Sequence, residues 1–130
     1  MPIAAEHQQT PLDFGTMTAG EITGAILKYL ITQGYTVWSQ NTTYIYDPDA
    51  QCWRVNPQGI RGVPDIIGFR NRDGLFIGVE VKAGRDQLRL HQKQFLDELK
   101  GAGGLAFVAH DLARFQRSFV LRGLVLLKEF

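Results

Sequence analysis

The chain has 130 residues, of which 45% are hydrophobic and 21% are charged, and its formal net charge is +1. This length predicts one domain with its own hydrophobic core, and the near-zero charge gives no overall attraction to nucleic acids. No apolar run reaches the roughly 20 residues of a membrane-spanning helix, the N-terminus lacks a secretory signal, and the single cysteine, Cys52, excludes an internal disulfide and a cysteine-based zinc site. We therefore expect an intracellular, cytoplasmic protein with no membrane partner.

The N-terminal part of the chain divides into an arm and a helix. Residues 1–15 are polar, contain two prolines and show no periodicity, which predicts a flexible arm in front of a single domain at residues 16–130. Residues 18–34, TAGEITGAILKYLITQG, carry apolar side chains at helical spacing and end in Gly34, a residue typical of helix C-termini.

The remaining sequence predicts strands and two more helices. In chain order these are a strand at 35–40, a β-hairpin within 42–57 whose turn is Asp47, Pro48 and Asp49, strands at 66–69 and 75–83, a helix at about 90–100, a strand at 105–109 and a helix capped by Asp111. The strand–helix–strand connection predicts a parallel pair, whereas the hairpins predict antiparallel pairs. The fold class is therefore α/β, with a central mixed β-sheet flanked by helices.

The strand LFIGVEVKA at 75–83 carries two opposite charges inside an apolar run. Its two-residue period puts Ile77, Val79 and Val81 on one apolar face and Phe76, Gly78, Glu80 and Lys82 on the other. Glu80 and Lys82 therefore project side by side. Taken alone, this pair is more typical of a surface ion pair on an exposed strand than of a catalytic site.

The preceding loop, RGVPD, changes this interpretation. Asp65 stands directly before the strand at 66–69, and Pro64 favours an extended approach to it. A Pro-Asp pair is also ordinary turn chemistry. However, a tight turn joins this strand to the next, so the two should be antiparallel neighbours that can bring Asp65 near Glu80. Two carboxylates and a main-chain carbonyl are suitable ligands for a hard divalent cation, and Lys82 beside them can stabilise a phosphate or orient water.

The pair Pro64-Asp65 followed by Glu80-Val81-Lys82 resembles the PD-(D/E)xK nuclease superfamily. The wider string RGVPDIIGF…GVEVKAGRDQLRLHQKQFLDELKGAGG resembles its VRR-NUC branch, from about Glu21 to about Asp111. The resemblance implies a restriction-endonuclease-like core. Residues 1–15 and the C-terminal tail carry no part of it.

The resemblance also implies roles for individual residues. Asp65, Glu80 and the main-chain carbonyl of Val81 would bind Mg²⁺ or Mn²⁺, and Lys82 would be the catalytic lysine. The glutamine of the following helix would be Gln92. Helical spacing supports this choice independently, because Gln92 shares a face with Phe95, Leu96 and Leu99, whereas Gln94 does not.

Glu21 has two interpretations of equal weight. Related nucleases often place an acid on the first helix that reaches the metal directly or through water. The string Thr18-Ala-Gly-Glu21 is also a capping box, with Thr18 as N-cap. The two roles can also alternate with metal binding.

Basic and aromatic residues are weaker candidates. We predict that six basic residues cluster around the site and contact phosphates, although each alone is typical of a solvated surface: Arg61, Arg70, Arg72, Arg85, Arg89 and Lys93. His91 adjoins Gln92, but a lone histidine at a helix start is usually incidental. Four aromatic residues favour sheet and hairpin packing over base stacking: Trp38, Tyr44, Tyr46 and Trp53.

These patterns predict a metal-dependent DNA endonuclease that hydrolyses phosphodiester bonds. Standalone members of the VRR-NUC family resemble Holliday-junction resolvases, so the resemblance implies branched DNA as substrate and a homodimer with paired sites. The brevity of the chain suits a bacterial or phage type of protein. Three alternatives stay open. They are a nuclease of the same chemistry acting on flaps or duplex ends, a non-catalytic nucleic-acid-binding module with a nuclease fold, and a chance match in a structural domain.

Overall fold

The computed structural model describes residues 17–40 and 44–126. The predicted arm at 1–15 and the end of the C-terminal tail lie outside these residues. The elements are α2 (Ala19–Thr32), β1 (Tyr35–Ser39), β2 (Tyr44–Asp47), β3 (Cys52–Val55), β4 (Ile66–Arg70), β5 (Phe76–Val81), α3 (Leu90–Gly101), β6 (Leu105–Ala109) and α4 (Leu112–Leu121). No helix in this part of the chain is both long and apolar enough to cross a bilayer.

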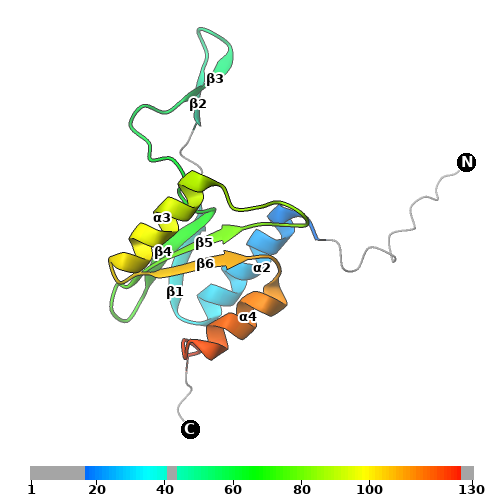
Figure 1. The fold of residues 1–130 in the computed structure, drawn as a ribbon, viewed down its shortest axis with the longest axis vertical. Coiled ribbons are helices and arrows are strands. Elements are labelled where there is room, and N and C mark those ends of the chain that lie inside the picture. The colour runs from blue at the N-terminus through cyan, green and yellow to red at the C-terminus, as the bar shows by residue number, and fades with distance from the viewer. Residues whose placement is uncertain (1–16, 41–43, 127–130) are drawn as a thin grey trace, which may run out of the picture.

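Four strands form the central sheet in the order β1-β4-β5-β6 (Figure 1). β1, β4 and β5 are antiparallel neighbours, and β6 returns parallel to β5 through helix α3. The α/β class, the mixed sheet and the flanking helices are therefore confirmed, and the architecture is that of a restriction-endonuclease-like fold.

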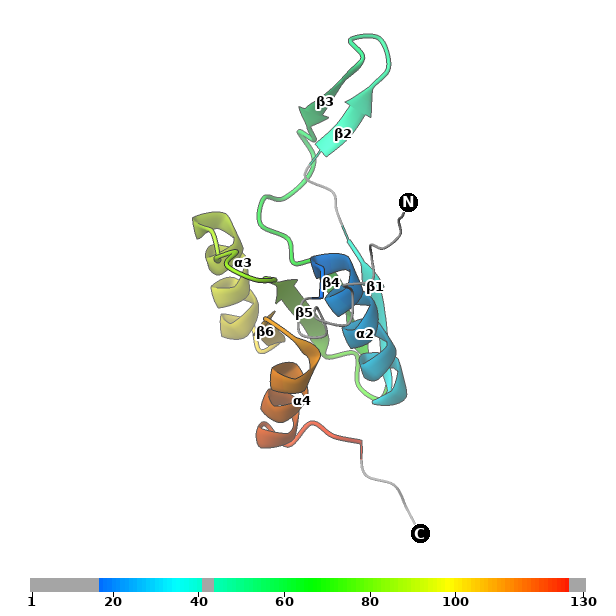
Figure 2. The ribbon, with the colours of Figure 1, turned by 90° about the vertical axis from the view of Figure 1, so that its right-hand side faces the viewer.

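The two faces of the sheet are covered differently. Helices α2 and α4 pack on one face and α3 on the other, as Figure 2 shows from the side. The core lies under α2 and α4. It includes the apolar face of β5, which was predicted from the sequence: Ile77, Val79 and Val81 are all buried. They pack with the buried apolar residues of the helices, which are Ile22, Ile26, Leu30, Phe115 and Phe119.

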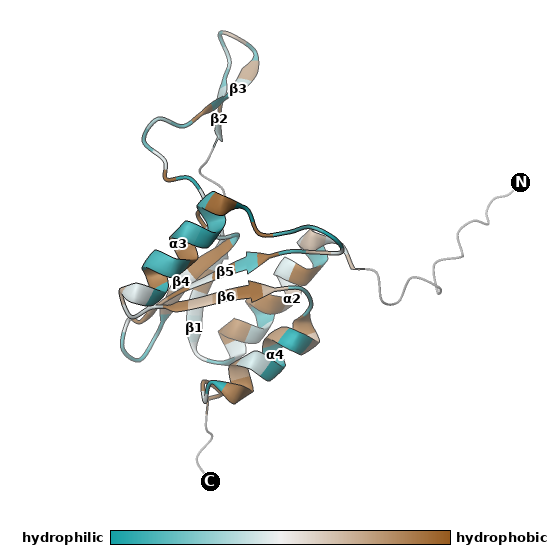
Figure 3. Cartoon of the chain, in the orientation of Figure 1, coloured by the Kyte–Doolittle hydropathy of each residue, from teal (hydrophilic) through white to brown (hydrophobic). Residues whose placement is uncertain are grey.

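The other face of β5 begins with Phe76 and continues with Gly78 and Glu80 beneath α3. A Cβ added to Gly78 would lie 3.0 Å from both Leu99 and Pro64, so glycine lets the helix and the loop approach the strand closely. α3 is coloured mostly hydrophilic in Figure 3, and among its residues Leu96 is buried. Helix α3 thus contributes few buried apolar side chains over the end of β5, where the polar side chains of Glu80 and Lys82 lie.

The helix ends follow the predicted capping signals. Thr18 is the N-cap of α2, and Gly34 follows the helix with a φ of +89°, a conformation that favours glycine. Asp111 caps α4 by accepting a hydrogen bond from the Arg114 amide at 2.7 Å. Ile31, although at helical spacing, is 59% exposed.

The predicted hairpin forms, but it is not part of the central sheet. β2 and β3 pair only with each other and project away from the domain (Figures 1 and 2). Tyr46 and Trp53 stack edge-to-face at 5.4 Å between ring centroids, yet they are 50% and 68% exposed. The predicted packing within the hairpin is therefore confirmed for Tyr46 and Trp53, although no other element in the described part of the chain covers them.

Candidate active site

Asp65 and Glu80 meet because β4 and β5 are antiparallel. Ile66 pairs with Val79, and continuing this register puts Asp65 opposite Glu80. The Val81 amide donates a hydrogen bond to Asp65 Oδ2 at 2.8 Å. The main-chain carbonyl of Asp65 accepts from the Gln40 amide at 2.7 Å, which joins this point to the end of β1. The aspartate is thus held between two strand ends.

Glu80 is a buried carboxylate with one oxygen occupied and one without a partner. Its side chain is 3% exposed. Gln92 Nε2 donates to Oε2 at 3.0 Å, whereas Oε1 has no hydrogen-bond partner in the described part of the chain. Burial, and secondarily the charge of Asp65, raises the pKa of Glu80 to about 7, against the opposing effect of Lys82. Such a group in a hollow is typical of functional sites.

Lys82 lies between two acids at the end of β5. Its Nζ is 3.6 Å from Glu80 Oε2 and 3.6 Å from Asp86 Oδ2. The lysine side chain is 4% exposed, so the surface ion pair considered from the sequence is instead a buried one. The Lys82 amide donates to the Ala109 carbonyl at 2.9 Å, and His110 Nδ1 lies 3.1 Å from the Lys82 carbonyl.

Asp86 and His110 were not identified from the sequence. Asp86 stands four residues after Lys82 in a loop that has no sequence periodicity, so only its charge and proximity along the chain pointed to it. His110 follows β6, which is parallel to β5. The signal for His110 was the predicted parallel pair, which brings the ends of these two strands together.

Gln92 occupies the inward face of α3, as its spacing predicted. Its Oε1 accepts from the Arg89 amide at 2.9 Å, while its Nε2 reaches Glu80. Gln94 is exposed. One side chain therefore ties the start of α3 to the Glu80 carboxylate.

Two hollows meet at the carboxylates. One, of about 660 Å³, runs along α2 and is lined by Gly20, Thr23 and Gly24 as well as Lys82 and Asp86. The other, of about 470 Å³, opens toward the base of the hairpin and is lined by Tyr44, Arg61, Arg89 and His91 among others. Asp65, Glu80 and Gln92 border both hollows. An extended ligand could therefore pass over the carboxylates from α2 to the hairpin.

Glu21 acts as a helix cap in the structure. The Thr18 amide donates to Glu21 Oε1 at 2.9 Å, and the Glu21 amide donates to Thr18 Oγ1 at 3.1 Å. These hydrogen bonds lower the pKa of Glu21. Gly20 and Thr23, rather than Glu21, line the neighbouring hollow. Its role toward a metal stays a prediction.

The predicted basic cluster is only partly at the site. Arg61 and Arg89 border the hollow beside the carboxylates. Lys93 pairs with Asp97 at 2.8 Å, and Arg85 is exposed in the loop before α3.

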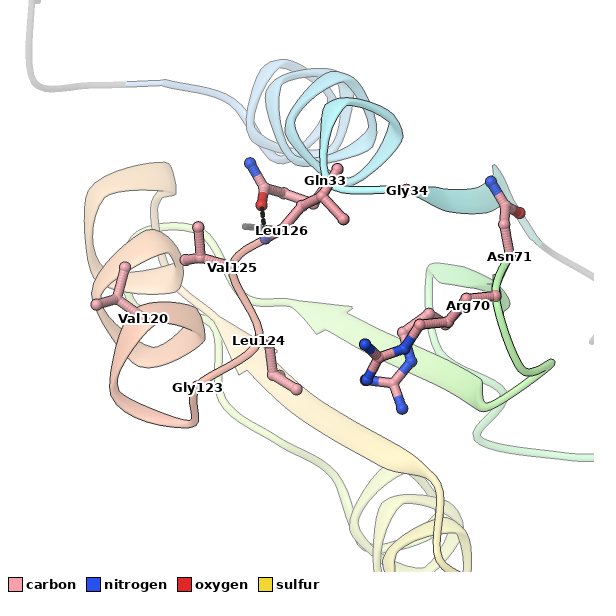
Figure 4. Close-up of a pocket in the computed structure, with 10 residues that line it drawn as sticks. Gln33, Gly34, Arg70, Asn71, Val120, Gly123, Leu124, Val125 and Leu126 are labelled. Atoms are coloured by element: carbon pink, nitrogen blue, oxygen red, sulfur yellow. Dashed lines mark hydrogen bonds between the residues drawn. The ribbon is translucent and has the colours of Figure 1, made fainter. Parts of the chain in front are cut away.

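The prediction of proximity is wrong for Arg70 and Arg72. They line a separate hollow of about 810 Å³ at the opposite end of β4, together with Gln33 and residues 123–126 (Figure 4). Arg70 is bound there by Asp73 at 2.7 Å. Asp65 precedes β4 and Arg70 ends it, so the length of the strand separates them. DNA contact by these arginines stays a prediction.

The donor set at the strand ends suits a hard cation. It consists of two adjacent carboxylates with a main-chain carbonyl between Glu80 and Lys82, all oxygen ligands. In the described residues, no three His, Cys, Asp or Glu side chains gather closely enough to form a complete side-chain cage. The buried, unpartnered Glu80 Oε1 is the observation that fits a cation, since a buried polar atom ordinarily has a partner.

A comparison with known protein families matches the part of the chain that carries these residues. The sequence model of the VRR-NUC domain matches residues 47–111, half of the chain. The chain belongs to the VRR-NUC domain family. The matched region contains Asp65, Glu80, Lys82 and Gln92, and it excludes Glu21 and Tyr44. The VRR-NUC family is part of the PD-(D/E)xK nuclease superfamily, whose members generally use divalent metals. A comparison with curated proteins gave no match.

Proposed function

We propose that this VRR-NUC protein is a divalent-metal-dependent DNA endonuclease whose active site is Asp65, Glu80, Lys82 and Gln92. The observation that carries the proposal is the convergence of two carboxylates and a buried lysine where two hollows meet. Burying Glu80 and Lys82 to 3% and 4% exposure costs desolvation free energy. That cost is difficult to explain by stability alone, because apolar residues at these positions would pack without it.

Each residue of the site has a different role in the proposed reaction. Asp65, Glu80 and the Val81 carbonyl would hold Mg²⁺ or Mn²⁺. When bound, such a cation neutralises charge on the phosphate and lowers the pKa of water. The Lys82 ammonium stabilises negative charge on the phosphate oxygens and orients the attacking water. Gln92 is a positioning residue, since its hydrogen bond fixes the Glu80 carboxylate relative to the start of α3.

Branched DNA is the proposed substrate class, and a cytoplasmic homodimer is the proposed acting form. A two-fold axis would supply two sites for paired cuts on a four-way junction. Exposed apolar side chains on the hairpin support a contact with another protein surface: Ile45, Trp53 and Val55 are 46%, 68% and 57% exposed. Arg61 and Arg89 at the hollow support contact with DNA phosphates.

The test is cleavage of four DNA forms by the purified chain. A four-way junction, a flap, a linear duplex and a single strand are each incubated with Mg²⁺, Mn²⁺ or EDTA. We expect symmetric nicks on the junction with either metal and none in EDTA. Sedimentation of the same sample gives its oligomeric state, for which we expect a dimer.

The other outcomes select between the remaining functions. Cleavage of flaps or duplex ends in preference to junctions would support metal-dependent hydrolysis but contradict four-way junctions as the preferred substrate. DNA binding without cleavage under any metal condition would favour a non-catalytic binding module. Cleavage that persists in EDTA would contradict the proposed chemistry.

A further inference from the structure

The hollow at the base of the hairpin is larger than the chemistry at the carboxylates requires. Its volume is about 470 Å³, within the range of roughly 300–1,000 Å³ typical of small-ligand sites. It begins at Glu80 and extends outward to Tyr44, the first residue of β2. A group bound there would be adjacent to the phosphate that is cut.

The basic residues of this hollow are available to an anion. Some arginines are neutralised by an acid, as Arg54 is by Asp47, Arg70 by Asp73 and Arg114 by Asp111. Arg61 and Arg89 border the hollow and have no carboxylate within ion-pair distance in the part of the chain that the structure describes. Two unneutralised guanidinium groups at one opening favour a phosphate.

The start of α3 reinforces this preference. Arg89, His91 and Gln92 border the hollow at the first turn of a 12-residue helix. The first turn carries no acidic residue, so the positive end of the helix dipole is not offset there. Gly62 keeps Arg61 close to this helix end, since a Cβ at that position would lie 2.1 Å from the His91 carbonyl oxygen.

The outer wall of the hollow is aromatic. Tyr44 is 50% exposed, and its neighbour across the hairpin is Val55. Among the described residues, the Tyr44 ring therefore has no aromatic partner of the kind that Tyr46 has in Trp53. An exposed ring beside a phosphate-binding group is the arrangement by which proteins stack unpaired bases. A base held in a duplex is already stacked on both sides and has no free face for the ring.

We propose that this hollow is a subsite for one unpaired nucleotide next to the scissile phosphate, with its base stacked on Tyr44 and its phosphate bound by Arg61 and Arg89. The subsite rests on the proposed nuclease function and specifies its substrate class. DNA with an unpaired nucleotide at the cut, as at an open branch point, is preferred to continuous duplex. Tyr44 then acts in specificity, and Asp65, Glu80 and Lys82 act in the chemistry.

The test measures stacking without cleavage. The full chain is mixed in EDTA with a branched DNA that carries one unpaired 2-aminopurine at the branch point, and the fluorescence of that base is followed. We expect quenching by the wild type and by Tyr44→Phe, and loss of quenching with Tyr44→Ala. The preference of the wild type for this DNA over a matched duplex should fall on the order of tenfold in Tyr44→Ala. Single alanine variants of Arg61 and Arg89 should each reduce the salt dependence of binding.

Tyr46→Ala is the matched control, because Tyr46 is equally exposed on the same strand but does not border the hollow. It should quench as the wild type does. Equal loss in Tyr46→Ala and Tyr44→Ala would overturn the subsite, since hairpin integrity would then explain both. Unchanged quenching in Tyr44→Ala, or no binding by the wild type, would also overturn it. Because the readout needs no cleavage, a protein that binds in this way but never cuts contradicts the nuclease function and leaves the subsite intact.

Discussion

The Gln92 amide donates a hydrogen bond to the Glu80 carboxylate at 3.0 Å while its oxygen accepts from the Arg89 backbone at 2.9 Å. One side chain therefore links the start of a helix to a buried acid on the adjacent strand. The bond holds Oε2 of the carboxylate in place and leaves Oε1 without a hydrogen-bond partner among the described residues. This contact accounts for the glutamine at that position of the helix better than an amphipathic pattern does.

Replacing Gln92 by alanine should lower cleavage more than stability. Loss of a residue that orients a metal ligand typically reduces activity by about 10- to 100-fold. The side chain is only partly buried, so the midpoint of urea unfolding should change little. Gln94→Ala is the control, since Gln94 is exposed on the same helix. Equal activity of the two variants would remove Gln92 from the site.

Glu80 makes the stability of the metal-free protein depend on pH. Its pKa rises from 4.5 to about 7 on folding, so the folded state binds a proton that the unfolded chain releases. This contribution is present in full below about pH 4.5 and disappears as pH rises through about 7, a change on the order of 3 kcal/mol. Urea unfolding in EDTA should therefore show falling stability over this range. Glu80→Gln should flatten the curve, and an unchanged slope in that variant would assign the effect to other groups.

A comparison of Gly62 with Gly74 distinguishes the cost of backbone strain from the cost of a steric clash. Its φ is +82° and an added Cβ would lie 2.1 Å from the His91 carbonyl oxygen. Gly74 has a similar φ of +76°, but nothing lies within 4 Å of its added Cβ. Gly74→Ala should cost about 1 kcal/mol of stability, whereas Gly62→Ala should cost clearly more and also reduce cleavage, because the loop bearing Asp65 must move. Equal unfolding midpoints would show that the contact is not tight.

Asp86 should weaken the binding of DNA when no metal is present. Its carboxylate is 3.6 Å from Lys82 Nζ and borders the hollow along α2, where it repels an incoming phosphate. Asp86→Asn should therefore bind DNA a few-fold more tightly in EDTA, with the difference reduced by salt. Asp97→Asn provides the comparison, since Asp97 pairs with Lys93 at the surface. Weaker binding by Asp86→Asn would mean that the acid holds Lys82 in place for DNA.

The sequence was sufficient to predict how the candidate site residues on regular elements are brought together. Alternation in β5 separated Glu80 from the apolar core face, and the short turn after β4 made the two strands antiparallel. Helical spacing then selected Gln92. These three inferences depend only on the period of strands and helices, which local sequence specifies.

Features that depend on tertiary position were harder to predict from the sequence. Arg70 is near Asp65 in sequence, but five residues of extended strand span roughly 16 Å and carry it to the other end of the sheet. Hairpin propensity predicted β2 and β3 without revealing that nothing in the described chain covers them. Asp86 lies in a loop, where no periodicity indicates the direction of a side chain.

The most direct test of the central claim is cleavage of junction DNA by Asp65→Asn and Lys82→Met with Mg²⁺ or Mn²⁺. Both changes preserve approximate side-chain volume, and circular dichroism checks that each variant is folded. Lys100→Met serves as the surface control, because Lys100 is exposed in the last turn of α3. We predict that the wild type and Lys100→Met cut, and that both site variants lose cleavage by at least about a thousandfold. Cleavage by folded Asp65→Asn or Lys82→Met at the wild-type rate would contradict an active site at these strand ends.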